Sequence, residues 1–399
     1  MLKSSILEVI NLQKEKNEKV EPGISRELLS EISLTGGHIK IISGIRRCGK
    51  STLMRQLIGE GTNSLFLNFE DPKLTGFDLN DFKRLDELIK ELGLKNIFFD
   101  EIQIVPEWER YIRALHDENY AVYLTGSNAS MLSIELGTKL TGRYISKELF
   151  PFSYHEFLTF SNQESSADSA VDFLYRGGFP EYLKYEDEDI LHQILYDIIY
   201  RDISVRYQIK RHETLKQLAI YLITNISKTL SYNQLRKTFE LGSATTAIDY
   251  LSYFQNSYLL FAIPLFDFSL KKQIYNPKKI YAIDTGLANV NSLSMSKDMG
   301  RKLENAIFLQ LRRKSNQIYY FTSQGECDFI VREQDQTLRC IQVCASLDEE
   351  NLTRELNGLS EAMKYSGATN GIIVTLEQED ELDKDGNVIK VIPFWKWTY

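Results

Sequence analysis

The nine residues 44–52, Gly-Ile-Arg-Arg-Cys-Gly-Lys-Ser-Thr, constrain the fold of this chain more than any other stretch. They fit the pattern G-x-x-x-x-G-K-[S/T], in which glycines let the backbone wrap around an anion so that successive N–H groups point at it. Residues 38–42 before it are typical of a buried strand, and residues 51–58 are typical of a helix whose N-terminus faces the anion. The sequence therefore predicts a phosphate-binding loop between a strand and a helix.

The residue types of this loop predict a site for ATP and Mg²⁺. Lys50 supplies a point charge for the β- and γ-phosphates, and the hydroxyl of Ser51 is a ligand for Mg²⁺. A glycine-rich turn without a ligand is the alternative, and the correct flanking strand and helix argue against it. The residues expected to contact the nucleotide are Gly44, Arg46, Arg47, Cys48, Gly49, Lys50, Ser51 and Thr52.

Two adjacent carboxylates follow a second apolar stretch. Residues 97–99 are typical of a buried strand, and Asp100 and Glu101 come directly after them. At the carboxyl end of a parallel strand beside a phosphate-binding loop, such side chains lie in the ligand crevice. We expect Asp100 to hold Mg²⁺ through water and Glu101 to polarise the attacking water as a general base. A strand end with solvated charges is the alternative.

Two further polar segments carry candidate catalytic residues. The strand of residues 121–124 leads into a turn in which either Ser127 or Asn128 could hydrogen-bond the γ-phosphate or the lytic water; an ordinary turn is the alternative. Arg143 follows a glycine, and an arginine placed in cis or in trans contributes about 10³–10⁵ to the rate of phosphoryl transfer. We assign Arg143 this role, against the alternative of a solvated loop charge. Supply in trans would require a homo-oligomer.

Composition limits the class of protein and its compartment. With 399 residues, 43% hydrophobic and 26% charged, the chain is expected to form two or three soluble domains. Its four cysteines have no paired close spacing, which predicts neither a disulfide framework nor a zinc site and favours a reducing cytoplasm. The longest apolar run, residues 258–266, is too short to span a bilayer, so we expect no membrane partner.

The net charge of −8 is unevenly spread. Residues 201–279 hold 12 Lys and Arg against 5 Asp and Glu, a net +7 that leaves −15 for the rest. Asymmetry of this size indicates one basic module on an acidic protein.

Nine short motifs follow one another along the chain. They are Gly-Ile-Arg-Arg-Cys-Gly-Lys-Ser-Thr (44–52), Phe-Phe-Asp-Glu-Ile-Gln (98–103), Leu-Thr-Gly-Ser-Asn (124–128), Leu-Thr-Gly-Arg-Tyr (140–144), Phe-Pro-Phe-Ser-Tyr-His-Glu-Phe (150–157), Gly-Gly-Phe-Pro-Glu (177–181), Tyr-Ala-Ile-Asp-Thr-Gly-Leu (281–287), Glu-Cys-Asp-Phe (326–329) and Ile-Pro-Phe-Trp-Lys-Trp (392–397). Together they resemble a family of prokaryotic AAA-type ATPases that carry a C-terminal domain of uncharacterised function, DUF4143. The resemblance covers nearly the whole chain and implies ATP hydrolysis, a helical lid and association with DNA.

These observations predict an α/β protein of several parts. We expect a P-loop domain of the AAA type with a parallel sheet over residues 1–165 and a helical lid over residues 166–210. A winged helix over residues 211–275 and a smaller nuclease-like α/β domain over residues 276–399 follow. The helical pattern breaks at Gly177-Gly178.

The predicted winged helix has three helices and strand material for a wing. Ser231 and Ser243 would cap the second and third helices, and Ala247, Ile248, Leu251 and Phe254 would form the core face of the third. The outward residues of that helix, Thr245, Thr246, Asp249, Ser252 and Tyr253, include none of the strong readers of base edges. The basic residues lie beside it, at Arg236, Lys237, Lys271, Lys272, Lys278 and Lys279. We therefore expect binding to double-stranded DNA through its backbone, with low sequence specificity. A protein contact is the alternative.

The last part, with expected strands at 280–284, 327–331, 338–344 and 371–376 and a helix at 300–314, resembles a restriction-endonuclease-like core. Such a core sets an acid on the helix, an Asp on one strand and Glu/Gln-x-Lys on the next. Glu304, Asp328 and Gln342 fit this pattern, but Cys344 stands where an active enzyme would have Lys. A thiol supplies no positive charge to the transition state, so we expect an inactive site. The alternative is that Glu304 and Asp328 are ordinary structural polar residues.

Three functions are compatible with the sequence. The leading interpretation is a cytoplasmic ATPase that couples nucleotide state to a C-terminal module contacting DNA. The alternatives are a nucleotide-gated switch acting on a protein partner and an ATP-regulated nuclease.

Overall fold

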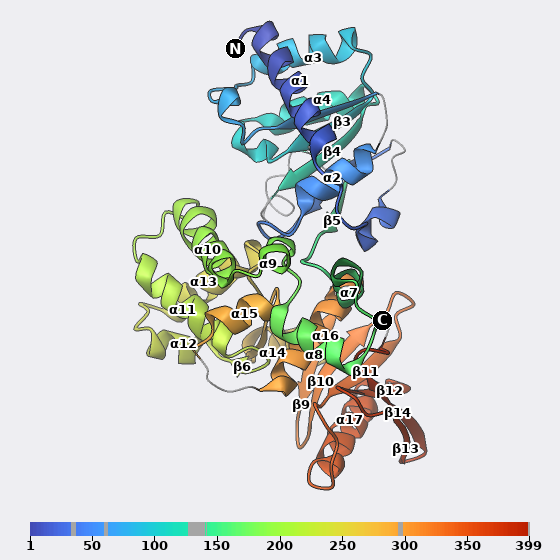
Figure 1. The fold of residues 1–399 in the computed structure, drawn as a ribbon. Helices are drawn as coiled ribbons and strands as arrows, with labels where there is room; N and C mark the ends of the chain where they lie inside the picture. The colour runs from blue at the N-terminus through green and yellow to red at the C-terminus, as the bar shows by residue number, and fades with distance from the viewer. Residues whose placement is uncertain (33–36, 60–62, 127–139, 141, 294–297, 398–399) are drawn as a thin grey trace. The chain divides into compact units, whose positions relative to one another are not determined.

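The computed structural model describes residues 1–399 apart from 33–36, 60–62, 127–139, 141, 294–297 and 398–399 (Figure 1). The chain divides into two compact units, Met1–Phe150 and Pro151–Tyr399. Among the described helices, none combines the length and apolar character needed to cross a membrane.

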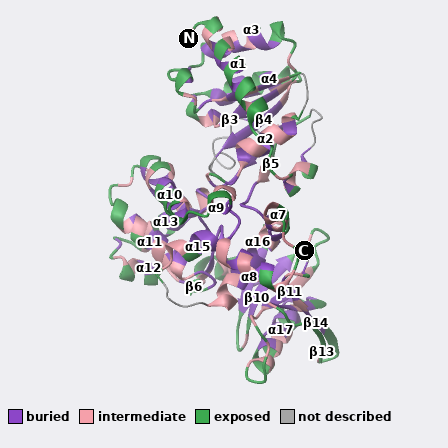
Figure 2. Ribbon diagram, viewed as in Figure 1, coloured by how far each residue is buried: buried purple, intermediate pink, exposed green. Residues whose placement is uncertain are grey.

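The first unit is built on a five-stranded parallel sheet with the strand order β2-β3-β4-β1-β5. The strands are β1 (Ile39–Ser43), β2 (Ser64–Asn68), β3 (Asn96–Asp100), β4 (Ala121–Gly126) and β5 (Tyr144–Glu148). Their apolar side chains are covered on both faces, as in most parallel sheets, and β3 and β4 are buried along nearly their whole length (Figure 2). The predicted parallel sheet is confirmed.

Helices and an aromatic cluster complete the first unit. The helices are α1 (Lys3–Lys19), α2 (Lys50–Ile58), α3 (Asp81–Glu91) and α4 (Trp108–Asp117), with short 3₁₀ turns η1 (Glu27–Glu31), η2 (Pro72–Leu74) and η3 (Ile102–Ile104). In α1 the buried residues Ile6, Val9, Ile10 and Gln13 recur at helical spacing and form one stripe. Phe69 packs edge-on against Phe77, Phe82 and Phe99 in the core.

The second unit begins with consecutive helices. They are α7 (Tyr154–Ser161), α8 (Ala167–Arg176), α9 (Pro180–Tyr185), α10 (Glu188–Asp197), a π-helix η4 (Ile198–Val205) and α11 (His212–Thr224). The predicted break at Gly177-Gly178 is confirmed, since α8 ends there and Gly177 has a φ of 70°. That these helices act as a lid over the nucleotide stays a prediction.

A three-stranded antiparallel sheet follows, with the order β6-β8-β7. Its elements are β6 (Thr229–Leu230), α12 (Tyr232–Thr238), α13 (Ala244–Asn256), β7 (Leu260–Ile263), α14 (Leu270–Tyr275) and β8 (Lys278–Ala282). The predicted caps are confirmed: Ser231 accepts from Gln234 N–H and Ser243 from Thr246 N–H. Ile248 was wrongly expected in the core; it is 44% exposed, and Tyr250 is buried instead.

A six-stranded mixed sheet ends the chain, with the order β13-β14-β12-β11-β10-β9. Its elements are α15 (Thr285–Asn291), α16 (Met299–Lys314), β9 (Ile318–Thr322), β10 (Glu326–Arg332), β11 (Leu338–Val343), α17 (Leu352–Ser366), β12 (Asn370–Thr375), β13 (Asp380–Lys384) and β14 (Asn387–Pro393). The strand expected near residues 280–284 was assigned to this part. This strand is observed as β8, and it pairs with β6 and β7 in the three-stranded sheet instead of joining the six-stranded sheet.

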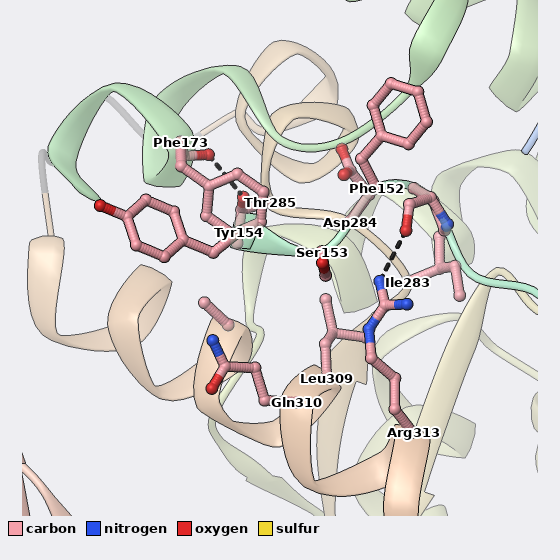
Figure 3. A pocket seen from close by; sticks show the side chains of 12 residues that line it. Phe152, Ser153, Tyr154, Phe173, Ile283, Asp284, Thr285, Leu309, Gln310 and Arg313 are labelled. Carbon is pink, nitrogen blue, oxygen red and sulfur yellow. Dashed lines mark hydrogen bonds between the residues drawn. The ribbon is translucent and has the colours of Figure 1, made fainter. Parts of the chain in front are cut away.

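Asp284 anchors the start of the second unit. Its carboxylate accepts from the N–H groups of Gly178 (2.6 Å) and Leu287 (2.7 Å), and burial raises its pKa to about 6. A Cβ on Gly177 would lie 2.3 Å from the same carboxylate, so only glycine fits there. A small pocket beside Asp284 is lined by Ser153 and Thr285 among others, and its free volume of about 10 Å³ has room for one water molecule (Figure 3).

Candidate nucleotide-binding site

The loop between β1 and α2 has the backbone geometry of a phosphate-binding loop. Gly49 is the N-cap of α2 with a φ of 101°, a conformation that favours glycine. At Gly44 the limit is space, because a Cβ would lie 2.1 Å from the carbonyl oxygen of Leu149. The two glycines of the motif are therefore required by the local structure, and the free N-terminus of α2 is directed at whatever the loop encloses.

Lys50 is buried within its own loop. The side chain is 5% exposed, and Nζ donates to the carbonyl oxygens of Gly44 (3.1 Å) and Ile45 (3.0 Å). These carbonyls hold the ammonium within the loop, where it would form an ion pair with a bound phosphate.

A buried arginine that the sequence did not single out supports the loop from behind. Arg26 donates through Nη1 to the carbonyl oxygen of Cys48 (2.8 Å) and through Nη2 to that of Phe150 (2.7 Å). Cys48 itself is fully buried, and burial raises the pKa of its thiol. Its Sγ donates to Leu149 O (3.4 Å), so the Cys48 side chain packs beneath the loop and its expected contact with nucleotide could come only from the backbone.

Asp100 is the meeting point of three elements at the carboxyl edge of the sheet. Its Oδ2 accepts from Ser51 Oγ on α2 (2.7 Å) and from Asn68 Nδ2 at the end of β2 (3.2 Å). Its Oδ1 accepts from Thr125 Oγ1 at the end of β4. A carboxylate and a hydroxyl at this distance are the hard oxygen ligands that Mg²⁺ takes in phosphoryl-transfer sites, so the residues present fit the ion.

Glu101 lies next to this cluster in a left-handed backbone conformation, with a φ of 52°. Its N–H donates to Thr125 Oγ1 (3.1 Å), and its carboxylate accepts from Gln103 Nε2. Burial raises the pKa of Glu101; Lys50 opposes this rise, Asp100 adds to it, and Gln103 opposes it. A carboxylate whose pKa is moved upward, beside Asp100 and Lys50, has the properties of a general base.

Of the three remaining candidates, the structure describes only Arg143. Ser127 and Asn128 lie outside the described residues. Arg143 precedes β5, and its carbonyl oxygen accepts from Ile39 N–H at the start of β1 (2.8 Å). The loop follows the other end of β1, roughly 16 Å away at the usual rise per residue. A role for Arg143 within its own subunit therefore has no support from the geometry, and its Nε faces Asp117 (3.4 Å).

The other expected nucleotide contacts lie in the loop and in the first turn of α2. Arg46 lies 3.9 Å from Glu70 through Nη1, Arg47 has a φ of 63°, and Thr52 is in the first turn of α2.

Sequence reasoning missed Asn68, Thr125, Gln103 and Arg26. The first two could have been found, because each is a polar residue at the carboxyl end of a parallel strand beside the loop.

Comparisons with known proteins identify an AAA domain in the first unit. An AAA domain family matches residues 36–158, and a domain of unknown function, DUF8612, matches residues 167–298. The "Uncharacterized protein MJ1544" of Methanocaldococcus jannaschii is 34% identical over 421 residues, covering 97% of this chain and 93% of that protein. The chain belongs to the same family as this protein. An uncharacterized protein of Haemophilus influenzae is 30% identical over 383 residues, 90% of this chain and 94% of that protein.

The first unit carries an AAA domain at residues 36–158. DUF8612 takes the place of DUF4143, which the resemblance had implied for the C-terminal part. Two solved structures are more distant. AMPPCP-bound DnaA from Aquifex aeolicus has a TM-score of 0.29 and 14% identity, over 62% of this chain and 88% of that chain. A STAND protein with a tetratricopeptide repeat sensor from Pyrococcus horikoshii has a TM-score of 0.31 and 15% identity, over 74% of this chain and 46% of that chain. Scores this low establish no shared overall fold.

Proposed function

We propose that this AAA-domain protein binds ATP with Mg²⁺ and hydrolyses it. The observation that carries the proposal is the 2.7 Å hydrogen bond between Ser51 Oγ and Asp100 Oδ2, which joins the loop helix to the acidic end of β3. Lys50 would bind the β- and γ-phosphates, and Ser51 and Asp100 would hold Mg²⁺. The ion would neutralise charge on the phosphates, and Glu101 would take the proton of the attacking water.

The segment that leads into the second unit supports a coupling of nucleotide state to that unit. Arg26 bonds both the loop carbonyl of Cys48 and the carbonyl of Phe150, the last residue of the first unit. The next residue, Pro151, is bonded through its carbonyl by Arg313 Nη2 of the second unit (2.6 Å). A shift of the loop around phosphate would therefore reach residue 150 through one guanidinium, and the peptide chain would carry it to residue 151.

Double-stranded DNA, contacted without strong sequence preference, remains the proposed partner of the second unit. The order of helices and strands from α11 to β8, with β8 between β6 and β7, is that expected for a winged helix. The basic surface is smaller than the sequence indicated, however. Lys279 is buried, Lys278 Nζ donates to the carbonyls of Gln273 and Ile274, and Lys272 pairs with Asp267 (3.0 Å).

A protein partner is the second candidate, and one observation favours it. The segment between β7 and β8 exposes four large apolar side chains within eight residues: Phe268 (74%), Leu270 (71%), Ile274 (61%) and Tyr275 (78%). Phosphate contacts need charge and do not need such a surface, whereas protein interfaces are enriched in aromatic residues.

Substitution of Lys50 tests the ATPase proposal. Lys50→Ala should abolish ATP binding, measured by titration with a fluorescent ATP analogue, and phosphate release should fall to background. Lys73→Ala, an exposed lysine whose Nζ lies 3.7 Å from Glu8, is the matched control and should behave as wild type. Wild-type phosphate release by Lys50→Ala would contradict the proposal.

A further inference from the structure

Lys279 lies at the centre of three carboxylates in the second unit. The side chain is 2% exposed, and Nζ is 2.7 Å from Asp328 Oδ1, 2.9 Å from Glu304 Oε1 and 3.1 Å from Glu326 Oε1. The acids come from α16 and β10, and the lysine from β8. An ammonium has three donors, and here each has an acidic acceptor. The cluster also ties the three-stranded sheet to the six-stranded one.

Neighbouring groups fix the carboxylates in place. Tyr281 Oη donates to Glu304 Oε1 (2.7 Å), and Val343 N–H donates to Asp328 Oδ2 (2.9 Å). Burial acts to lower the pKa of Lys279, but Asp328, Glu304 and Glu326 outweigh it and raise that pKa well above its usual value. The three carboxylates therefore favour the charged form of the lysine. Burial and Asp328 raise the pKa of Glu304 to about 8, which reduces the negative charge of the cluster at neutral pH.

Glu304 and Asp328 are the two acids that the sequence assigns to a nuclease-like site. A third member, Gln342, bridges Asp328 and α17: its Oε1 accepts from Asp328 N–H (3.2 Å), and its Nε2 donates to Glu355. Cys344 Sγ donates to Ser346 O (2.8 Å) and accepts from Asn351 Nδ2 (3.6 Å) just before α17. The sequence predicted that position 344 lacks the required lysine. The sequence did not show that Lys279, from a different strand, lies between these acids.

We infer that the Lys279 ammonium takes the place of a divalent cation among Glu304, Asp328 and Glu326, so that the second unit holds no catalytic metal ion there. The geometry does not fit a bound metal, because the position that all three acids share is filled. Across the described residues, no three His, Cys, Asp or Glu side chains are placed to hold a metal ion. A DNA phosphate would also have to reach an ammonium that is 2% exposed. This inference is independent of the proposed ATPase function.

Divalent metal binding to the full-length protein tests the inference. Mn²⁺ titrations followed by electron paramagnetic resonance, in the absence of nucleotide, should give the same curve for wild type and Asp328→Asn. The Lys279→Met variant should melt about 10 °C lower, because it leaves buried carboxylates without a cation. Millimolar Mn²⁺ should restore part of that loss, and the restoration should disappear in Lys279→Met/Asp328→Asn. Lys278→Met is the matched control, because its Nζ bonds carbonyls of the preceding segment, and its melting temperature should respond to Mn²⁺ as that of wild type does.

Three results would overturn the inference. One is Mn²⁺ binding by wild type that Asp328→Asn removes, which does not depend on the folding of any Lys279 variant. Another is Mg²⁺-dependent nicking of supercoiled plasmid by wild type that Lys279→Met abolishes; this would make the lysine part of a working nuclease site. The third is a folded Lys279→Met protein whose melting temperature does not move with Mn²⁺.

Discussion

The hydroxyl of Ser51 donates to the carboxylate of Asp100 at 2.7 Å, and this bond joins two segments that are far apart in the sequence. Ser51 lies in the first turn of the helix after the glycine-rich loop, and Asp100 ends the strand two positions away from β1 in the sheet. Parallel pairing of β1 with β4 and of β4 with β3 places these ends at one edge. The sheet topology thus assembles the oxygen ligands expected for Mg²⁺.

Arg26 should link the loop to the end of the first unit. Arg26→Gln removes the guanidinium fork and leaves the carbonyls of Cys48 and Phe150 without their charged donor. Loss of a hydrogen bond between a charged donor and a buried acceptor costs about 1.5–3 kcal/mol. We expect weaker ATP binding, on the order of ten-fold in Kd, and a lower melting temperature. Isothermal titration with a non-hydrolysable ATP analogue checks this, and Arg26→Lys should recover only part of the loss because it lacks the fork. Unchanged affinity in Arg26→Gln would remove the residue from the coupling route.

Gln103 should set the pH dependence of hydrolysis. Its amide donates to the Glu101 carboxylate, and this hydrogen bond lowers a pKa that burial has raised. A general base works when it is deprotonated, so activity falls as pH drops through the pKa of Glu101. Gln103→Leu removes the lowering contribution, and the acid limb of the kcat profile should move to higher pH. A profile that stays in place, or that moves to lower pH, would show that Gln103 does not act on Glu101.

Much of the first unit could be predicted from sequence because its signals are local. The loop, the apolar strand before it and the two carboxylates at a strand end each occupy a short stretch, and a parallel sheet brings such ends together. The partners of Lys279 could not be predicted, because they depend on which sheet β8 joins. Its apolar residues suit either sheet, and only pairing with β6 and β7 points Lys279 at Glu304 and Asp328. The position of Arg143 relative to the loop likewise depends on strand direction. A residue just before a parallel strand lies at the edge of the sheet opposite the loop.

Arg143 should act between subunits if it acts in hydrolysis at all. Its place at the start of β5 separates it from the loop of its own chain, so specific activity should rise with protein concentration. Mixing inactive Arg143→Ala with inactive Lys50→Ala chains should restore part of the activity, because one intact loop can then meet one intact arginine. Phosphate release over a dilution series, with light scattering for the oligomeric state, checks this. Constant specific activity in a monomeric sample would exclude the trans role.

The affinity for double-stranded DNA should fall less steeply with salt concentration than the number of lysines in residues 201–279 suggests. Each lysine that contacts phosphate contributes about one unit to the slope of log K against log salt. Lys271→Ala should flatten the slope by about one unit. Lys278→Ala should leave it unchanged, because carbonyl oxygens already surround that Nζ. Fluorescence anisotropy over a salt series distinguishes these outcomes. Absence of any salt-dependent binding would favour the protein partner, and a strong preference for one site would contradict backbone-driven contact.

The most direct measurement of the central claim is parallel ATP binding and phosphate release by the Glu101→Gln protein. The substitution keeps the size and hydrogen-bonding capacity of the side chain but removes the base, so ATP should bind as in wild type while the rate of hydrolysis falls by about 10²–10⁴-fold. Glu91→Gln, a glutamate of α3 whose side chain is 61% exposed and pairs with Lys3, is the matched control and should hydrolyse ATP at the wild-type rate. Wild-type hydrolysis by Glu101→Gln would contradict the account.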